Sequence, residues 1–176
     1  MNAPDPSPSS VEQWFLDAYE QYADAIFRHC ALRLMDREQG RELMQETFIR
    51  AWESVGRGTK VENCRAFLYK VANNLIIDVA RRRKLRTQDS LEALQETGFD
   101  LPDREPSPAR QTEAALAMES MRKLDEPYRT ALVMRFVDGL PPAEIAKVLG
   151  VSQNVISVRI HRGLEKLESA VNPSHD

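Results

Sequence analysis

Apolar residues recur at three- and four-residue steps along most of the chain, which is the period of an amphipathic α-helix. The first such stripe consists of Phe15, Tyr19, Tyr22, Ile26 and Cys30. No segment combines strict alternation of apolar and polar residues with the β-branched enrichment of a strand. The pattern therefore predicts an all-α protein.

Two further helices are expected in the first half. Asp36 can cap a helix that ends near Gly56, and Asn63 can cap a third helix that runs to about Arg83. The inward stripe of the second helix is Met44, Phe48, Ala51, Trp52 and Val55. The inward stripe of the third helix is Phe67, Val71, Leu75 and Val79. These three helices would form one small domain.

Proline, glycine and acidic residues then interrupt the pattern, which indicates a flexible acidic linker. Helical periodicity resumes near Arg110. Pro127 opens a further helix that we expect to end near Gly139, with Leu132, Val133 and Phe136 inward. The predicted division of the chain is a disordered tail at 1–10, a helical domain at 11–86, the linker at 87–109, a second helical domain at 110–170 and a tail at 171–176.

The segment Pro141–Leu167 has the outline of a helix-turn-helix, in which the second helix enters the DNA major groove. Ala146 is small enough for close helix packing, and Gly150 tolerates the positive φ that the turn needs. Ser152 can cap the second helix, and Ile156 would anchor its inner face. The segment therefore predicts a DNA-binding element in the second domain.

The outer face of the predicted recognition helix is polar and basic. It carries Gln153, Asn154, Ser157, His161 and Arg162. Glutamine and asparagine can pair with adenine edges, and arginine can pair with guanine or phosphate. An ordinary two-helix corner with a solvated outer face is the plainer interpretation of the same residues.

Charge is distributed unevenly, although the net charge is only −3. Nine basic and two acidic residues lie between Arg57 and Arg86, whereas seven acidic and two basic residues lie between Thr87 and Glu113. A basic block followed by an acidic one suggests a nucleic-acid surface and a linker that avoids it.

A second candidate surface lies on the predicted helix that Asp36 caps. Ile49 falls in the middle of its acidic outer face, which carries Glu42, Gln45, Glu46 and Glu53. An apolar residue ringed by carboxylates suggests a contact patch for a basic, partly apolar partner. A lone surface isoleucine, which is common, is the alternative.

Composition excludes several classes of protein. No apolar run approaches the ~20 residues that span a bilayer, so no membrane insertion is expected. The N-terminus resembles no signal peptide, and two cysteines form no disulfide framework, so a cytoplasmic location is expected. Cys30 fits a core position, whereas Cys64 near a loop leaves a redox role open. No metal cluster or nucleophile–base set is visible, so we expect neither an enzyme nor a cofactor.

Three segments together resemble the bacterial sigma-70 family of RNA polymerase sigma factors. RELMQETFIRAW at Arg41–Trp52 is similar to the family's core-polymerase-binding motif. CRAFLYKVANNLIIDVARRRK at Cys64–Lys84 is similar to the helix that recognises the promoter −10 element. The helix-turn-helix, which includes the string Arg-x-His-Arg from Arg159, resembles the −35-reading domain. Two such domains without further regions are typical of the extracytoplasmic-function (ECF) group.

The resemblance implies a role for each group of candidate residues. For binding core polymerase these are Glu42, Gln45 and Glu46, on the face that Ile49 marks. For the −10 element they are Tyr69, Asn73, Asn74, Arg81, Arg82 and Arg83, although Asn73 replaces a common arginine. For the −35 element they are Gln153, Asn154, Ser157, Arg159, His161 and Arg162. Gln153, Asn154 and Ser157 are not a set typical of the family, so the −35 sequence that this chain reads cannot be copied from relatives.

The implied function is therefore a sigma factor that directs promoter recognition and transcription initiation. Core RNA polymerase and promoter DNA are its expected partners, and an anti-sigma protein is a further candidate. A dimeric helix-turn-helix regulator that acts without polymerase is the alternative, and it would read palindromic sites. An all-helical adaptor that binds only protein is a third possibility.

Overall fold

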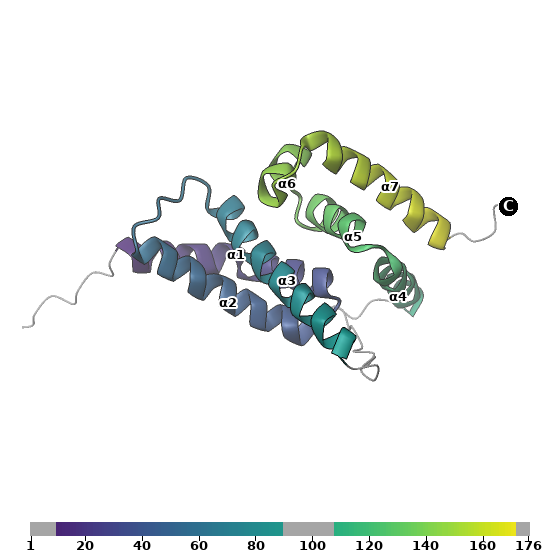
Figure 1. Ribbon diagram of the computed structural model, residues 1–176, viewed down its shortest axis with the longest axis horizontal. Helices are drawn as coiled ribbons and strands as arrows, with labels where there is room; N and C mark the ends of the chain where they lie inside the picture. Colours follow the sequence, from purple (N-terminus) through teal and green to yellow (C-terminus); the bar gives the residue numbers. More distant parts are fainter. Residues whose placement is uncertain (1–9, 90–107, 172–176) are drawn as a thin grey trace, which may run out of the picture.

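The computed structural model describes residues 10–89 and 108–171, and within these ranges it is helical without any strand (Figure 1). This confirms the all-α prediction. The first half is a bundle of three long helices, α1 (Ser10–Leu34), α2 (Arg37–Gly56) and α3 (Cys64–Asp89). The predicted capping residues open the last two. Asp36 accepts a hydrogen bond from the Gln39 backbone N–H, and Asn63 accepts one from that of Ala66.

The predicted apolar stripes form the core of this bundle. Phe48 and Ala51 of α2 and Leu68 and Ala72 of α3 are almost fully buried. Cys30 of α1 is buried beside them, as expected, and burial raises the pKa of its thiol to about 12. The rings of Phe15 and Tyr19 pack edge-on against Phe48 and stack on each other, and Trp52 packs edge-on against Phe15.

Residues 108–171, the described part of the second half, form four α-helices and one π-helical turn. These are α4 (Pro108–Lys123), α5 (Glu126–Leu132), η1 (Val133–Val137), α6 (Pro142–Leu149) and α7 (Gln153–Val171). Gly139, with φ +69°, turns the chain between η1 and α6.

The sequence prediction for Phe136 is wrong. Leu132 and Val133 are buried as expected, but Phe136 is 60% exposed and Met134 is buried instead. The physical reason is the π-helical turn, which fits an extra residue into the turn and so rotates the following side chains away from a regular helix. Periodicity of 3.6 residues cannot anticipate that shift.

The helices flanking the predicted linker are longer than expected. α3 continues past Arg83 to Asp89, and α4 begins at Pro108. The rest of the predicted linker, residues 90–107, lies outside the described residues, as do residues 1–9 and 172–176 of the predicted tails.

The two halves lie against each other (Figure 1), which the sequence did not predict. α6 packs on α3, and η1 and α5 pack on α1. Side chains from both halves share one continuous apolar cluster, which includes Ile26 and Leu68 from the first half and Met134 and Leu140 from the second. Polar contacts also cross the boundary, among them those from the buried His29 to Asp138 and from the buried Arg33 to the half-exposed Glu126.

Within the described residues, no helix is both long enough and apolar enough to cross a membrane.

Candidate functional site

The helix-turn-helix forms as the sequence predicts. α6 ends at Leu149 and is capped by Gly150, which has φ +67° and donates its backbone N–H to the Ala146 carbonyl. The Ser152 hydroxyl accepts a hydrogen bond from the Val155 N–H at 3.3 Å, which caps α7. Ile156 is completely buried and fixes α7 against the domain. The turn, the cap and the anchor together set which face of α7 points outward.

The outward face of α7 presents most of the predicted −35 residues. Gln153, Asn154, Ser157, His161 and Arg162 are exposed, and Arg159 is half-buried. The Ser157 hydroxyl donates to the Gln153 carbonyl at 3.1 Å, so its one proton is already used within the helix. His161 Nε2 lies 3.4 Å from Glu165 Oε1, one turn along the same helix. Gln153 and Asn154 thus lie exposed near the start of α7.

The predicted partner-binding face of α2 is exposed. Ile49 is 52% exposed, and Glu42, Gln45 and Glu53 are exposed around it. Glu46 is partly occupied, because its Oε1 accepts a hydrogen bond from Arg50 Nε at 2.7 Å. Glu53 Oε2 lies 3.9 Å from Arg57, so it too is paired. The face therefore combines an apolar centre with several carboxylates, which suits a partner with basic and apolar groups.

The predicted −10 residues divide into an exposed and a buried group. Asn74 is exposed, whereas Tyr69 and Asn73 are only 2% and 4% exposed. The Asn73 amide oxygen accepts a hydrogen bond from Arg33 Nη1 at 3.2 Å. Burial raises the pKa of the Tyr69 hydroxyl, as does the nearby carboxylate of Asp138, to which this hydroxyl is hydrogen-bonded. In this arrangement neither Tyr69 nor Asn73 can reach DNA.

The basic cluster at the end of α3 is also divided. Arg81 and Arg82 are exposed, with Arg81 at the long distance of 3.9 Å from Asp78. Arg83 instead turns back toward the junction of α1 and α2. It lies 3.3 Å from Asp36 Oδ2, 3.4 Å from the Leu34 carbonyl, and in contact with Gln39. Arg83 thus braces the bundle, while Arg81 and Arg82 are exposed to solvent.

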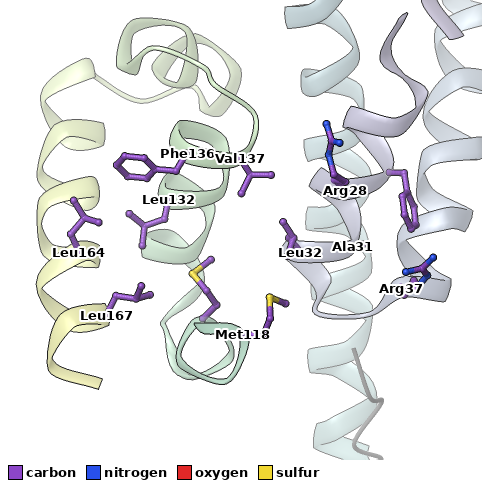
Figure 2. Close-up of a pocket in the computed structure, with 12 residues that line it drawn as sticks. Arg28, Ala31, Leu32, Arg37, Met118, Leu132, Phe136, Val137, Leu164 and Leu167 are labelled. Atoms are coloured by element: carbon purple, nitrogen blue, oxygen red, sulfur yellow. The ribbon is translucent and has the colours of Figure 1, made fainter. Parts of the chain in front are cut away.

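Sequence reasoning missed an apolar groove between the two halves (Figure 2). Its volume is about 460 Å³. Figure 2 shows Leu132, Phe136, Leu164 and Leu167 of the second half on one side and Leu32 and Arg28 of α1 on the other. No periodicity in the sequence indicates this groove, because it is lined by residues from both halves of the chain.

The described residues contain no group of three or more histidine, cysteine, aspartate or glutamate side chains that could hold a metal ion. Cys64 is half-buried, and burial raises the pKa of its thiol. A raised pKa reduces the thiolate fraction at neutral pH and so disfavours a redox role for Cys64.

Two family models match the chain, one on each half. The model described as Sigma-70 region 2 matches residues 18–86, and that described as Sigma-70, region 4 matches residues 115–167. The first match spans most of α1 and the whole acidic face of α2 and reaches Arg86 of α3. The second match contains the helix-turn-helix.

Curated relatives agree with these matches. The ECF RNA polymerase sigma factor SigW of Bacillus subtilis is 27% identical over 161 residues, which are 87% of this chain and 86% of the relative. The ECF RNA polymerase sigma factor SigE of Mycolicibacterium smegmatis is 33% identical over 153 residues. That similarity spans 84% of this chain but 57% of the relative.

Solved structures share the fold. The sigma factor RpoE of Bartonella quintana, in its complex with the anti-sigma factor NepR, superimposes with a TM-score of 0.78 at 18% identity. It covers 93% of this chain and 99% of that one. CnrH, in complex with the cytosolic domain of CnrY, superimposes with a TM-score of 0.68 at 20% identity, over 93% of this chain and 90% of that one.

Proposed function

Because this chain belongs to the sigma-70 family, and within it to the ECF group, we infer that it is a sigma factor. It binds core RNA polymerase and directs promoter recognition and transcription initiation. The observation that carries this conclusion is the pair of region 2 and region 4 matches, in that order, on the two helical halves. A dimeric regulator acting without polymerase is not favoured, because it would not need the region 2 half.

We propose that the acidic face of α2 binds core polymerase through Glu42, Gln45, Glu46 and Ile49. The exposed position of Ile49 among carboxylates supports this assignment. Burial of one isoleucine at an interface stabilises a complex by about 1.5–3 kcal/mol. The surrounding carboxylates contribute mainly to orientation and to the rate of association.

We propose that the −35 element is read by Gln153, Asn154, Ser157, Arg159, His161 and Arg162. For the −10 element we propose Tyr69, Asn73 and Asn74 for bases, with Arg81 and Arg82 for phosphates, whereas Arg83, which pairs with Asp36, positions α3 against the bundle. Their exposed members, Asn74, Arg81 and Arg82, lie along α3 in the free protein. Unpairing a base costs a few kcal/mol, which stacking and hydrogen bonds in a pocket offset.

Two DNA sites in one chain act together once the polymerase holds them. Each domain needs only weak affinity, since the first contact raises the effective concentration of the second. We propose that this sigma factor performs no chemistry itself, works in the cytoplasm with the polymerase and needs no cofactor. An anti-sigma protein is a further proposed partner, by analogy with the NepR complex of the Bartonella sigma factor.

The experiment that tests the function is reconstitution with core polymerase. The wild-type protein should co-elute with core enzyme in gel filtration and start transcription from a library of promoter sequences. Ile49→Glu should lose co-elution, whereas Leu16→Glu, at another exposed apolar residue of the first half, should keep it. Dimerisation without co-elution would support the dimeric regulator. The absence of both dimerisation and co-elution would support the adaptor.

A further inference from the structure

Two valines lie exposed on the recognition helix α7, among the residues proposed to read the −35 element. Val155 is 37% exposed and Val158 is 40% exposed, and neither belongs to that proposed set. Val158 follows Asn154 by four positions and precedes Arg162 by four, so these three side chains lie along one face of the helix. An apolar side chain thus stands in the middle of the polar outer face of α7.

The buried anchor of α7 shows where the two valines point. Ile156 is completely buried against the domain. Val158 follows Ile156 by two positions, which places it about 200° around the helix, nearly opposite the anchor. Val155 precedes Ile156 by one position and lies about 100° from it. Val158 is therefore close to the centre of the outer face, and Val155 is at its edge.

The first half of α7 is the part suited to enter the major groove. A helix-turn-helix reads bases with the N-terminal residues of its recognition helix. Both valines lie within the first two turns of α7, which begins at Gln153. Glu165, further along the same helix, is exposed, and its carboxylate would be repelled by DNA phosphates. Val155 and Val158 therefore lie on the part of α7 that meets bases.

Valine is an unfavourable residue for an exposed helical position. Its β-branch restricts χ1 and lowers its helix propensity below that of alanine. The same branch holds the two methyl groups in one preferred rotamer, so little conformational entropy is lost when they are buried against a partner. Val155 and Val158 are thus suited to contact a rigid apolar group outside the domain.

The major groove offers one apolar group at its base edges, the 5-methyl group of thymine. Adenine, guanine and cytosine present hydrogen-bond donors and acceptors there, with which a valine cannot pair. A valine pressed against those polar edges would leave them without partners, which is unfavourable. Val158 therefore favours thymine over the other three bases at the position it meets.

We propose that Val158 reads a thymine of the −35 element through its 5-methyl group, and that Val155 contacts a second thymine on a neighbouring base pair. The two valines are three residues apart, about 4.5 Å along the helix axis, which is comparable to the spacing of about 3.4 Å between successive base pairs. The inference rests on the proposed function for the DNA that α7 meets. It adds base identity at positions where α7 offers no hydrogen-bonding side chain.

The test removes methyl groups from each side of the contact in turn. Holoenzyme is reconstituted from the full-length chain and core polymerase, and its −35 element is defined by selection from a randomised library. Each thymine of that element, on either strand, is then replaced singly by deoxyuridine, which lacks only the 5-methyl group. Equilibrium binding to each duplex is measured for wild type, Val158→Ala and Val155→Ala. Val137→Ala, which truncates another exposed valine of the second half, is the matched control.

We expect deoxyuridine at one thymine to weaken wild-type binding about fourfold, which is the effect of one buried methyl group. Val158→Ala should abolish this difference at that thymine, since the two methyl losses are coupled, whereas Val137→Ala should preserve it. Val158→Ile, which keeps the β-branch, should preserve it as well. Val155→Ala should abolish the difference at a neighbouring thymine instead. Alanine is the better helix former, so these variants should fold, which circular dichroism checks.

Equal affinity of the wild type for thymine and deoxyuridine at every position would overturn the proposal. A difference that persists in both Val158→Ala and Val155→Ala would also overturn it, because the difference would then arise from the deformability of the DNA itself. A wild-type holoenzyme that selects no −35 sequence would overturn the proposed function together with this inference, so the two failures are distinguishable.

Discussion

Gly40 of α2 lies directly against Ala31 of α1, and a β-carbon at position 40 would come within 2.6 Å of the Ala31 Cα and Cβ. Two of the three nearest atoms belong to the Ala31 backbone, which cannot rotate away. The close crossing of α1 and α2, on which the acidic face of α2 depends, therefore requires glycine at this position.

Gly40→Ala should lower the free energy of unfolding by about 1–3 kcal/mol, because the added methyl group forces the two helices apart. The higher helix propensity of alanine recovers at most about 1 kcal/mol. Urea unfolding followed by circular dichroism measures the change. Gly56→Ala is the matched control, since no atom lies within 4 Å of a β-carbon there, and it should leave stability unchanged or slightly raised.

Arg82 and Arg83 are adjacent but should differ in what they do. Arg82→Ala should reduce the slope of log promoter affinity against log salt concentration by about 0.7–0.9, which is the contribution of one phosphate contact. Arg83→Ala should instead lower the free energy of unfolding by roughly 0.2–1 kcal/mol, because it breaks a half-exposed pair with Asp36. Promoter binding by the holoenzyme across a salt series, and thermal unfolding of the free protein, separate the two effects. Equal salt slopes for wild type and Arg82→Ala would show that Arg82 contacts no phosphate.

Local features of the fold could be predicted from the sequence because they depend on neighbouring residues. The caps at Asp36, Asn63 and Ser152 and the left-handed turn at Gly150 each form within one helical turn of the residue concerned. The inward stripes follow from the helix period. The exposure of Ile49 could be predicted for the same reason.

Contacts between residues far apart in the chain could not be predicted in this way. His29 and Asp138 are 109 positions apart, and no periodicity couples them. Tyr69 was assigned to DNA because of a family resemblance, which says nothing about whether the second half covers it. Arg83 could not be distinguished from Arg82, since only the path of α3 past Asp36 brings one of them onto the α1–α2 junction.

Stability should depend on pH through His29. Burial lowers its pKa, outweighing the opposing influence of Asp138, and the nearby Arg33 lowers it further. The unfolded chain therefore takes up a proton near the ordinary pKa of about 6.5, while the folded protein resists it. The free energy of unfolding should fall as pH decreases below about 6.5, by at most about 1.4 kcal/mol per pH unit from this one group.

Urea unfolding between pH 5.5 and 7.5 measures this dependence. His29→Gln should flatten it while lowering stability at pH 7, because the contact with Asp138 is weakened. If stability still depends on pH in His29→Gln, a titratable group other than His29 causes the dependence.

The −35 residues should not contribute equally to readout. Asn154 is exposed near the start of α7 and no hydrogen bond of its amide is seen within the described part of the chain, whereas the Ser157 hydroxyl donates to the Gln153 carbonyl. Asn154→Ala should therefore cost about 1–3 kcal/mol of discrimination at one promoter position. Ser157→Ala should cost less discrimination, since the hydroxyl proton of Ser157 is already donated within the helix.

Lys166, which lies 5.5 Å from the centroid of the Tyr128 ring, provides a control in which a positive charge is removed without loss of a base contact. Lys166→Ala should weaken all sequences alike. Holoenzyme selection from a randomised −35 library measures each preference, and a uniform loss in Asn154→Ala would place that side chain on the DNA backbone instead.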